Sequence, residues 1–151
     1  MKNNNSIKPV VAVGIGAALF FVLGRFVAIP SPVPNTNISL QYAVLALLAA
    51  MYGPVAGGLI GHTLIDLSWG GSPWWSWVIA SAFVGVVVGL FAKKLDLQEG
   101  EFGKKKMAAF TVANIAAHLL AWVVVAPVLD ILIYAEPVKK VFAQGAFAAV
   151  S

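Results

Sequence analysis

Long apolar runs, broken only by short polar segments, restrict what this sequence can fold into. Hydrophobic residues make up 60% of the 151 residues and charged residues only 11%, with a mean hydropathy of +0.89. A water-soluble domain carries about 25% charged residues, so this chain cannot cover a soluble surface. The composition therefore predicts an all-α integral membrane protein that forms a single domain.

The apolar runs predict a bundle of six transmembrane helices, at about 10–29, 38–52, 54–67, 74–92, 107–126 and 138–151. Twenty helical residues cover about 30 Å, which is one hydrocarbon thickness. The second and third helices are short for a span, and a re-entrant hairpin is the alternative. We favour two short crossing helices, because the flanking polar loops then lie on one face of the membrane. The sixth helix is about 21 Å long, so we expect its end to be missing.

Lysines cluster at one connection and indicate the orientation of the chain. Lys93–Lys94 and Lys104–Lys106 bracket a polar segment, which the positive-inside rule places in the cytoplasm of the cell together with the N-terminus. The same rule accounts for the net charge of +4 without a nucleic-acid partner. Counting crossings then places three connections outside together: the Pro/Asn segment 30–37, the tryptophan-rich segment 66–77 and an acidic segment 127–137.

Two of these outer connections carry groups suited to ligand binding. Segment 66–77 holds four of the five tryptophans, and its glycines and proline prevent a helix. Indoles at a bilayer boundary either anchor the chain at the headgroups or line a pocket, and we expect both roles, with Trp74 or Trp75 in the pocket. The three prolines of segment 30–37 predict a stiff, extended connection that presents the amides of Asn35 and Asn37. A helix cap is the alternative role for Asn37.

Polar residues inside the spans are few. His62 and Asp66 are four residues apart on the third helix, and Asn114 and His118 are four apart on the fifth, so each pair shares a helix face. These faces either form hydrogen bonds between helices or contact a ligand. Arg25, near the outer end of the first helix, is expected to extend to the interface.

Other chemistries find little support in the motifs. A metal site built from His62, Asp66, His118 and Asp130 has suitable ligand atoms but no spacing of the HExxH kind. A Ser/His/Asp hydrolase lacks a GxSxG elbow for Ser76. Residues 100–104 lack the order of a phosphate-binding loop, and there is no cysteine. We therefore predict no cofactor, no metal and no enzymatic activity.

Five segments carry a resemblance to a known family: Gly24–Pro30, Pro34–Tyr42, Gly53–Gly57, Gly71–Trp77 and Pro127–Tyr134. Over almost its whole length the chain resembles an S component of an energy-coupling factor (ECF) transporter. It is most similar to the subgroup labelled riboflavin-type, some members of which are assigned to the hydroxymethylpyrimidine precursor of thiamine. The resemblance implies a six-helix membrane protein whose ligand lies near the outer face, covered by the first, third and fifth loops.

The resemblance also implies partners. S components dock on a membrane T component, which couples them to two cytoplasmic ATPases, through an Ala-x-x-x-Ala pattern on the first helix. This chain has Ala12-x-x-x-Gly16 and Gly14-x-x-x-Ala18 in that place. Packing of these small residues within the subunit is the alternative.

The expected function is capture of a vitamin or vitamin precursor from outside and its delivery inward when the partner ATPases turn over. The ligand would stack on an indole, bond to amide or imidazole groups, and be covered by the Pro-rich loop. A membrane enzyme or a structural membrane subunit is the alternative. The predicted substrate-binding residues are Asn35, Asn37, Gln41, Trp69, Trp74, Trp75, Asn114, His118, Asp130 and Tyr134.

Overall fold

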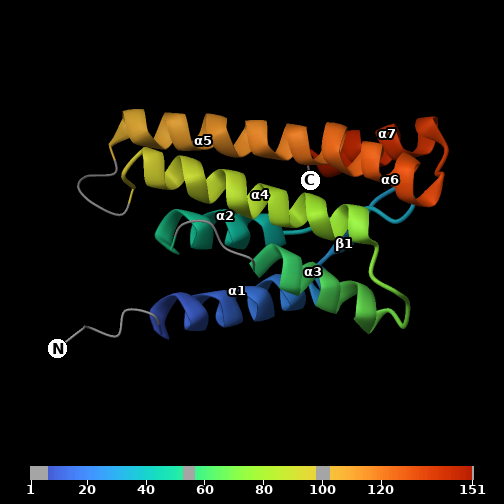
Figure 1. Cartoon of the computed structure of the whole chain (residues 1–151), viewed down its shortest axis with the longest axis horizontal. Coiled ribbons are helices and arrows are strands. Elements are labelled where there is room, and N and C mark those ends of the chain that lie inside the picture. Colours follow the sequence, from blue (N-terminus) through green and yellow to red (C-terminus); the bar gives the residue numbers. More distant parts are fainter. Residues whose placement is uncertain (1–6, 53–56, 98–102, 151) are drawn as a thin grey trace.

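The computed structural model describes residues 7–52, 57–97 and 103–150, and it is a bundle of helices with one small hairpin (Figure 1). Its elements are α1 (Ile7–Phe26), β1 (Ile29–Pro30), β2 (Asn37–Ile38), α2 (Gln41–Tyr52), α3 (Gly57–Ser68), α4 (Trp75–Lys94), α5 (Lys104–Leu119), a π-helical turn (Leu120–Val125), α6 (Ala126–Tyr134) and α7 (Val138–Ala148). Within these ranges, Trp75–Lys94 and the continuous helix Lys104–Tyr134 are long and apolar enough to cross a membrane. The all-α class is confirmed, while the number of six spans stays a prediction.

Helix α4 is the centre of the bundle. It contacts α2 and α3 on one side and α5, the π-helical turn and α6 on the other, while α1 packs mainly on α3 and α2. Small residues make this close packing possible, because Ser81, Gly85 and Gly89 form a buried stripe along α4. Figure 1 shows α1 and α5 on opposite sides of α4.

The helix that begins at Lys104 continues to Tyr134, so the predicted loop over 127–137 is wrong for most of its length. A proline in a helix lacks an N–H and clashes with the carbonyl four residues earlier. The wide turn Leu120–Val125 lies just before Pro127 and makes room for its ring. The helix ends only where Ala135 adopts a left-handed conformation, with φ of 52°.

The wide turn also changes the spacing of the buried face. The buried stripe of this long helix runs through Ala113, Ala117, Ala121, Ala126 and Asp130. The steps are four residues except across the π-helical turn, where the step is five. Asp130 therefore stays on the face that packs into the bundle.

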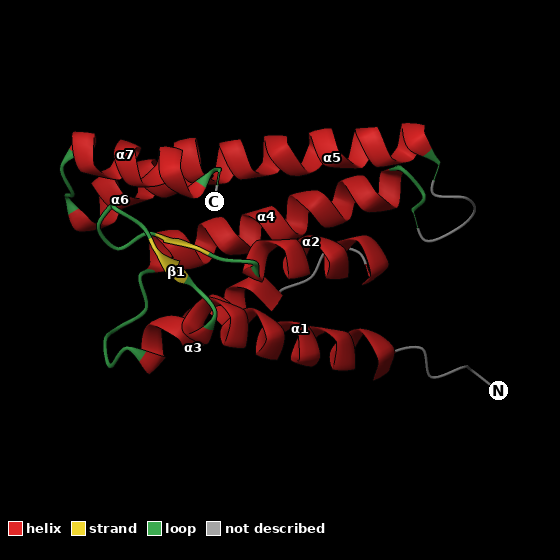
Figure 2. Ribbon diagram, turned by 180° about the vertical axis from the view of Figure 1, so that it is seen from behind, coloured by secondary structure: helices red, strands yellow, loops and turns green. Residues whose placement is uncertain are grey.

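The Pro-rich segment forms a tight hairpin rather than a simple extended connection (Figure 2). Strands β1 and β2 are antiparallel, with Ile29 opposite Ile38 and Pro30 opposite Asn37. Asn35 makes the reversal in a left-handed conformation, with φ of 57°, which asparagine tolerates better than most residues. The prolines stiffen the hairpin and the turn residue closes it.

The connections gather at two ends of the bundle. In Figure 1 the α3–α4 connection and the α6–α7 turn lie at one end. The start of α1, the end of α4 and the start of α5 lie at the other, which is the end that carries Lys93–Lys94 and Lys104–Lys106. The pair Lys139–Lys140 lies at the first end, at the start of α7. The segments that the sequence singles out for ligand binding thus share one end with each other.

Candidate functional site

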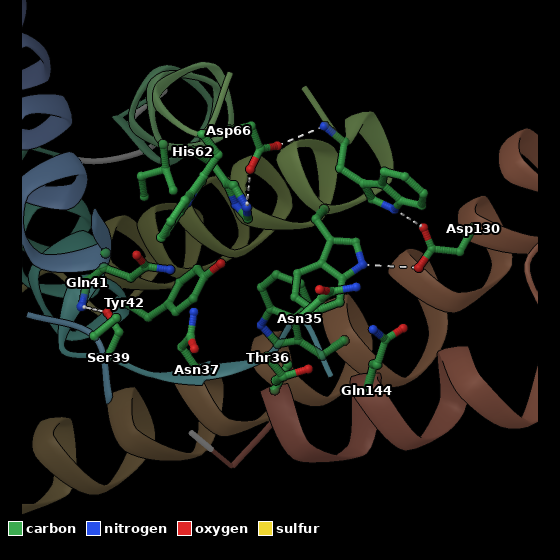
Figure 3. A pocket seen from close by; sticks show the side chains of 18 of the residues that line it. Asn35, Thr36, Asn37, Ser39, Gln41, Tyr42, His62, Asp66, Asp130 and Gln144 are labelled. Carbon is green, nitrogen blue, oxygen red and sulfur yellow. Dashed lines mark hydrogen bonds and ion pairs between the residues drawn. The ribbon is translucent and has the colours of Figure 1, made fainter. Parts of the chain in front are cut away.

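A cavity of about 540 Å³ lies between the hairpin, α2, α3, the start of α4, the π-helical turn, α6 and α7 (Figure 3). Its walls combine three kinds of group: indole rings, side-chain amides and a few carboxylates. The sequence predicts six of its lining residues: Asn35, Asn37, Gln41, Trp69, Trp74 and Asp130. The cavity is therefore the place where the separate outer segments converge.

Asp130 holds two of the cavity's tryptophans in place. Its carboxylate accepts hydrogen bonds from Trp74 Nε1 at 2.7 Å and from Trp77 Nε1 at 3.0 Å (Figure 3). It also accepts a hydrogen bond from the hydroxyl of Ser76. The residue is only 2% exposed. A buried carboxylate needs such donors, and the first turn of α4 supplies all three while its N-terminal dipole favours the negative charge. Asp130, on α6, thus orients the two indoles at the start of α4.

Trp74 is held on a second side by Tyr134. The two rings are stacked, with centroids 4.0 Å apart and planes 21° apart. The Tyr134 hydroxyl also accepts a hydrogen bond from the backbone N–H of Trp75 at 2.9 Å. Tyr134 therefore covers one face of the Trp74 ring, and the uncovered part of the side chain lines the cavity.

Asp66 fixes the start of α4 from the neighbouring helix α3. Its Oδ2 accepts a hydrogen bond of 2.7 Å from the backbone N–H of Trp74, the N-cap residue of α4, whose own side chain makes no capping bond. Its Oδ1 lies 3.8 Å from His62 Nε2. On the other edge of that imidazole, Nδ1 lies 2.5 Å from Ser81 Oγ, which also contacts the Tyr42 hydroxyl at 2.8 Å.

Helix α7 connects the hairpin to the rest of the site. Gln144 Nε2 donates a hydrogen bond of 2.8 Å to the carbonyl oxygen of Pro34, at the tip of the hairpin. One turn earlier, Lys140 forms an ion pair of 2.7 Å with Glu136. Gln144, Lys140 and Glu136 all line the cavity. The last described helix is thus part of the site and holds the hairpin against it.

Comparison with known proteins identifies the family. The family model "ECF-type riboflavin transporter, S component" matches residues 4–151. The chain belongs to this family. The S component resembles a UPF0397 protein of Enterococcus faecalis, 51% identical over 154 residues that cover 100% of this chain and 84% of the relative. It is 56% identical over 146 residues to a UPF0397 protein of Streptococcus agalactiae serotype Ia, covering 95% of this chain and 80% of the relative. No solved structure matches.

Family membership gives the S component its general role. The chain is a membrane protein of a transport system, in which it has the substrate-specific role. S components work with a T component and ATPases and bind a vitamin-type ligand. The long apolar helices agree with the membrane location.

Four predicted substrate-binding residues of the S component lie outside the cavity lining: Trp75, Asn114, His118 and Tyr134. His118 Nδ1 contacts the carbonyl oxygen of Asn114, in its own helix, at 3.0 Å. Its ring is edge-on to Tyr42 with centroids 5.5 Å apart, so it supports a lining residue from behind. We propose no direct ligand contact for these four.

The cavity also contains residues that the sequence prediction left out. His62 and Asp66 share one helix face in the sequence, where hydrogen bonding between helices is the alternative to ligand contact. Tyr42 and Trp122 gave no signal, because a single aromatic residue in an apolar helix is ordinary core. The sequence prediction also omits Gln144, a polar side chain in the body of the last helix.

Outside the cavity, Arg25 reaches the end of α3. Its guanidinium lies 3.7 Å from the centroid of the Trp69 ring, and its Nε donates a 3.0 Å hydrogen bond to Ser68 Oγ. A cation over an indole face is attracted by the ring quadrupole. Arg25 therefore holds Trp69 at the rim of the cavity.

The two small-residue pairs of α1 face different ways. Ala12 and Gly16 are buried, and a Cβ on Gly16 would meet the side chain of Leu48 in α2. Gly14 and Ala18 are exposed, and a Cβ on Gly14 would meet nothing within 4 Å. The first pair packs within the subunit, whereas the second leaves a smooth outer surface.

Proposed function

We propose that the S component captures a water-soluble vitamin or vitamin precursor, either riboflavin or the hydroxymethylpyrimidine precursor of thiamine, at the outer face of the cell membrane. The observation that carries the proposal is the cavity, in which indoles and amides from separate elements converge. Its volume of about 540 Å³ lies within the range of about 300–1,000 Å³ typical of small-molecule sites.

The lining suits a planar heterocycle. Trp74, Trp77 and Trp122 offer aromatic surfaces, and stacking on such surfaces tolerates many ring systems. Asn37 and Gln41 offer amide donors and acceptors at the side of the hairpin. Indoles fixed by Asp130 and Tyr134 lose little freedom on binding, which favours affinity.

The hairpin is suited to cover the bound ligand. It lies over the cavity through Asn35, Thr36 and Asn37, and the hydrogen bond from Gln144 attaches its tip to α7. Opening that contact would release the hairpin without disturbing the helices. We place this end of the bundle outside and the N-terminus in the cytoplasm, as the lysine distribution favours.

Delivery inward would use a T component and two ATPases, which would hydrolyse the ATP. We propose that Gly14 and Ala18 form the contact with the T component, because this pair is exposed on α1 and lets another helix approach closely. Ala12 and Gly16 are already used within the subunit and are left out of the docking surface.

Binding of the purified protein tests the proposal. Intrinsic tryptophan fluorescence is titrated with riboflavin and with hydroxymethylpyrimidine for the wild type, Trp74→Ala and Trp75→Ala. We expect one ligand to bind, and Trp74→Ala to weaken it about 10- to 100-fold because a stacking surface is lost. Trp75 is the matched control, since it adjoins Trp74 but lies outside the cavity lining. Absence of binding of both ligands, or equal losses in the two variants, would refute the assignment.

A further inference from the structure

We infer where His62 carries its proton from the hydrogen bonds around Ser81. Ser81 Oγ lies 2.9 Å from the carbonyl oxygen of Trp77, 2.8 Å from the Tyr42 hydroxyl and 2.5 Å from His62 Nδ1. A carbonyl oxygen only accepts, so the single hydrogen of Ser81 goes to Trp77. The hydroxyl oxygen of Ser81 then accepts from both Tyr42 and His62 Nδ1–H. In the neutral imidazole, Nε2 is consequently the acceptor.

That acceptor nitrogen lies beside a second acceptor. Asp66 Oδ1 is 3.8 Å from His62 Nε2, which is too long for a direct hydrogen bond, while Asp66 Oδ2 is used by the backbone of Trp74. Both residues line the cavity, and Figure 3 shows them side by side. A group with two N–H donors, placed about 2.9 Å from each atom, satisfies both acceptors. A hydroxyl satisfies only one of them, and a carbonyl oxygen satisfies neither.

Trp122, next to Tyr42, contributes its ring and not its N–H to the same cavity. The Trp122 side chain is only 1% exposed, and its Nε1 has no acceptor among the residues that the structure describes. It lines the cavity with its ring edge-on to that of Tyr42, at a centroid distance of 5.4 Å. A buried N–H without an acceptor is costly, but Nε1 is enclosed by protein, so a ligand acceptor has no access to it.

We propose that His62 and Asp66 are a specificity-determining acceptor pair for a primary amino group on a planar nitrogen heterocycle. The inference rests on the proposed function, because it concerns the ligand of the same cavity. An aminopyrimidine has such an exocyclic amino group. The ring system of riboflavin has carbonyl groups and a ring N–H but no exocyclic amino group, so the pair selects against it.

Calorimetric titration of the full chain in detergent tests the pair directly. The probes are 4-amino-5-hydroxymethyl-2-methylpyrimidine, its 4-oxo analogue, and riboflavin. We expect the wild type to prefer the amino compound over the oxo compound by about 10- to 100-fold. Asp66→Asn should abolish this preference: its amide oxygen still accepts from Trp74, but its NH₂ occupies the place of the ligand's amino group. His62→Gln should reduce the preference as well.

Two features keep the test decisive. The preference is a ratio of two affinities measured on one variant, so a partial loss of folded protein does not change it. Asp96→Asn makes the same chemical change at an exposed carboxylate outside the cavity and should keep the full preference. Equal binding of the amino and oxo compounds, or a preference that persists in both cavity variants, overturns the acceptor pair and leaves the proposed function standing. Failure of all three compounds to bind overturns both.

Discussion

Replacing Asp130 by asparagine tests how the cavity is organised. The carboxylate receives Trp74 Nε1 and Ser76 Oγ on Oδ1, and Trp77 Nε1 on Oδ2. An amide has one acceptor oxygen, which can keep the first two donors. Its NH₂ then faces the indole N–H of Trp77, so two donors meet and one buried hydrogen bond is lost.

The size of the effect follows from that single lost contact. A hydrogen bond to a charged group contributes about 1.5–3 kcal/mol, and leaving a buried donor unsatisfied costs a similar amount. We therefore expect Asp130→Asn to lower the free energy of unfolding by at least about 1.5 kcal/mol. Because both indoles line the cavity, ligand affinity should fall about tenfold or more, since about 1.4 kcal/mol corresponds to a factor of ten.

The assay combines thermal unfolding in detergent with ligand titration, because the two readouts separate folding from orientation of the indoles. Asp96→Asn serves as the control, since Asp96 is exposed at the lysine-rich end of the bundle. It should match the wild type in both measurements. If Asp130→Asn also matches the wild type in both, the carboxylate does not position the tryptophans, and the reasoning fails.

Three further predictions follow from single contacts. Gly145→Ala should cost about 1–3 kcal/mol in thermal unfolding experiments, because a Cβ there meets the carbonyl oxygen of the π-helical turn and the following proline ring; Gly71→Ala, with nothing within 4 Å, should be close to neutral. Gln144→Ala removes the hydrogen bond to Pro34 and should accelerate ligand dissociation in stopped-flow fluorescence, and an unchanged rate would exclude the attachment of the hairpin. Ala18→Leu should weaken co-purification with a T component without changing ligand affinity, and full assembly would rule out that docking face.

The sequence predicts the helical membrane class because local composition decides it. Apolar runs must be helical in lipid, so their existence follows without tertiary information. The gathering of Asn37 and Trp74 at one end could be predicted as well, since counting crossings from the lysine cluster places both segments on the same side. These predictions depend only on composition, charge and the order of elements.

Other features depend on contacts between distant parts of the chain. Pro127 normally interrupts a helix, and only the wide turn before it, packed against Gly145, allows the helix to continue. The direction of His118 illustrates a second difficulty. Asn114 and His118 share a helix face, but the neighbour of the His118 ring is Tyr42 rather than the cavity. Periodicity gives the face of a helix, whereas the neighbouring side chain decides what that face meets.

The five-residue step in the long helix decides whether the carboxylate of Asp130 faces the interior of the bundle or the lipid. Nine residues separate Ala121 from Asp130, and nine residues of uninterrupted α-helix amount to about two and a half revolutions. A regularly wound helix would therefore point Asp130 away from the side of Ala121 and toward hydrocarbon, where an ionised aspartate costs at least about 2.5 kcal/mol. The one extra residue in the π-helical turn rotates Asp130 to the inner side of the helix, where the indoles of Trp74 and Trp77 donate to it. A local change in helix winding thus moves a carboxylate out of lipid and lets it fix two indoles of the cavity.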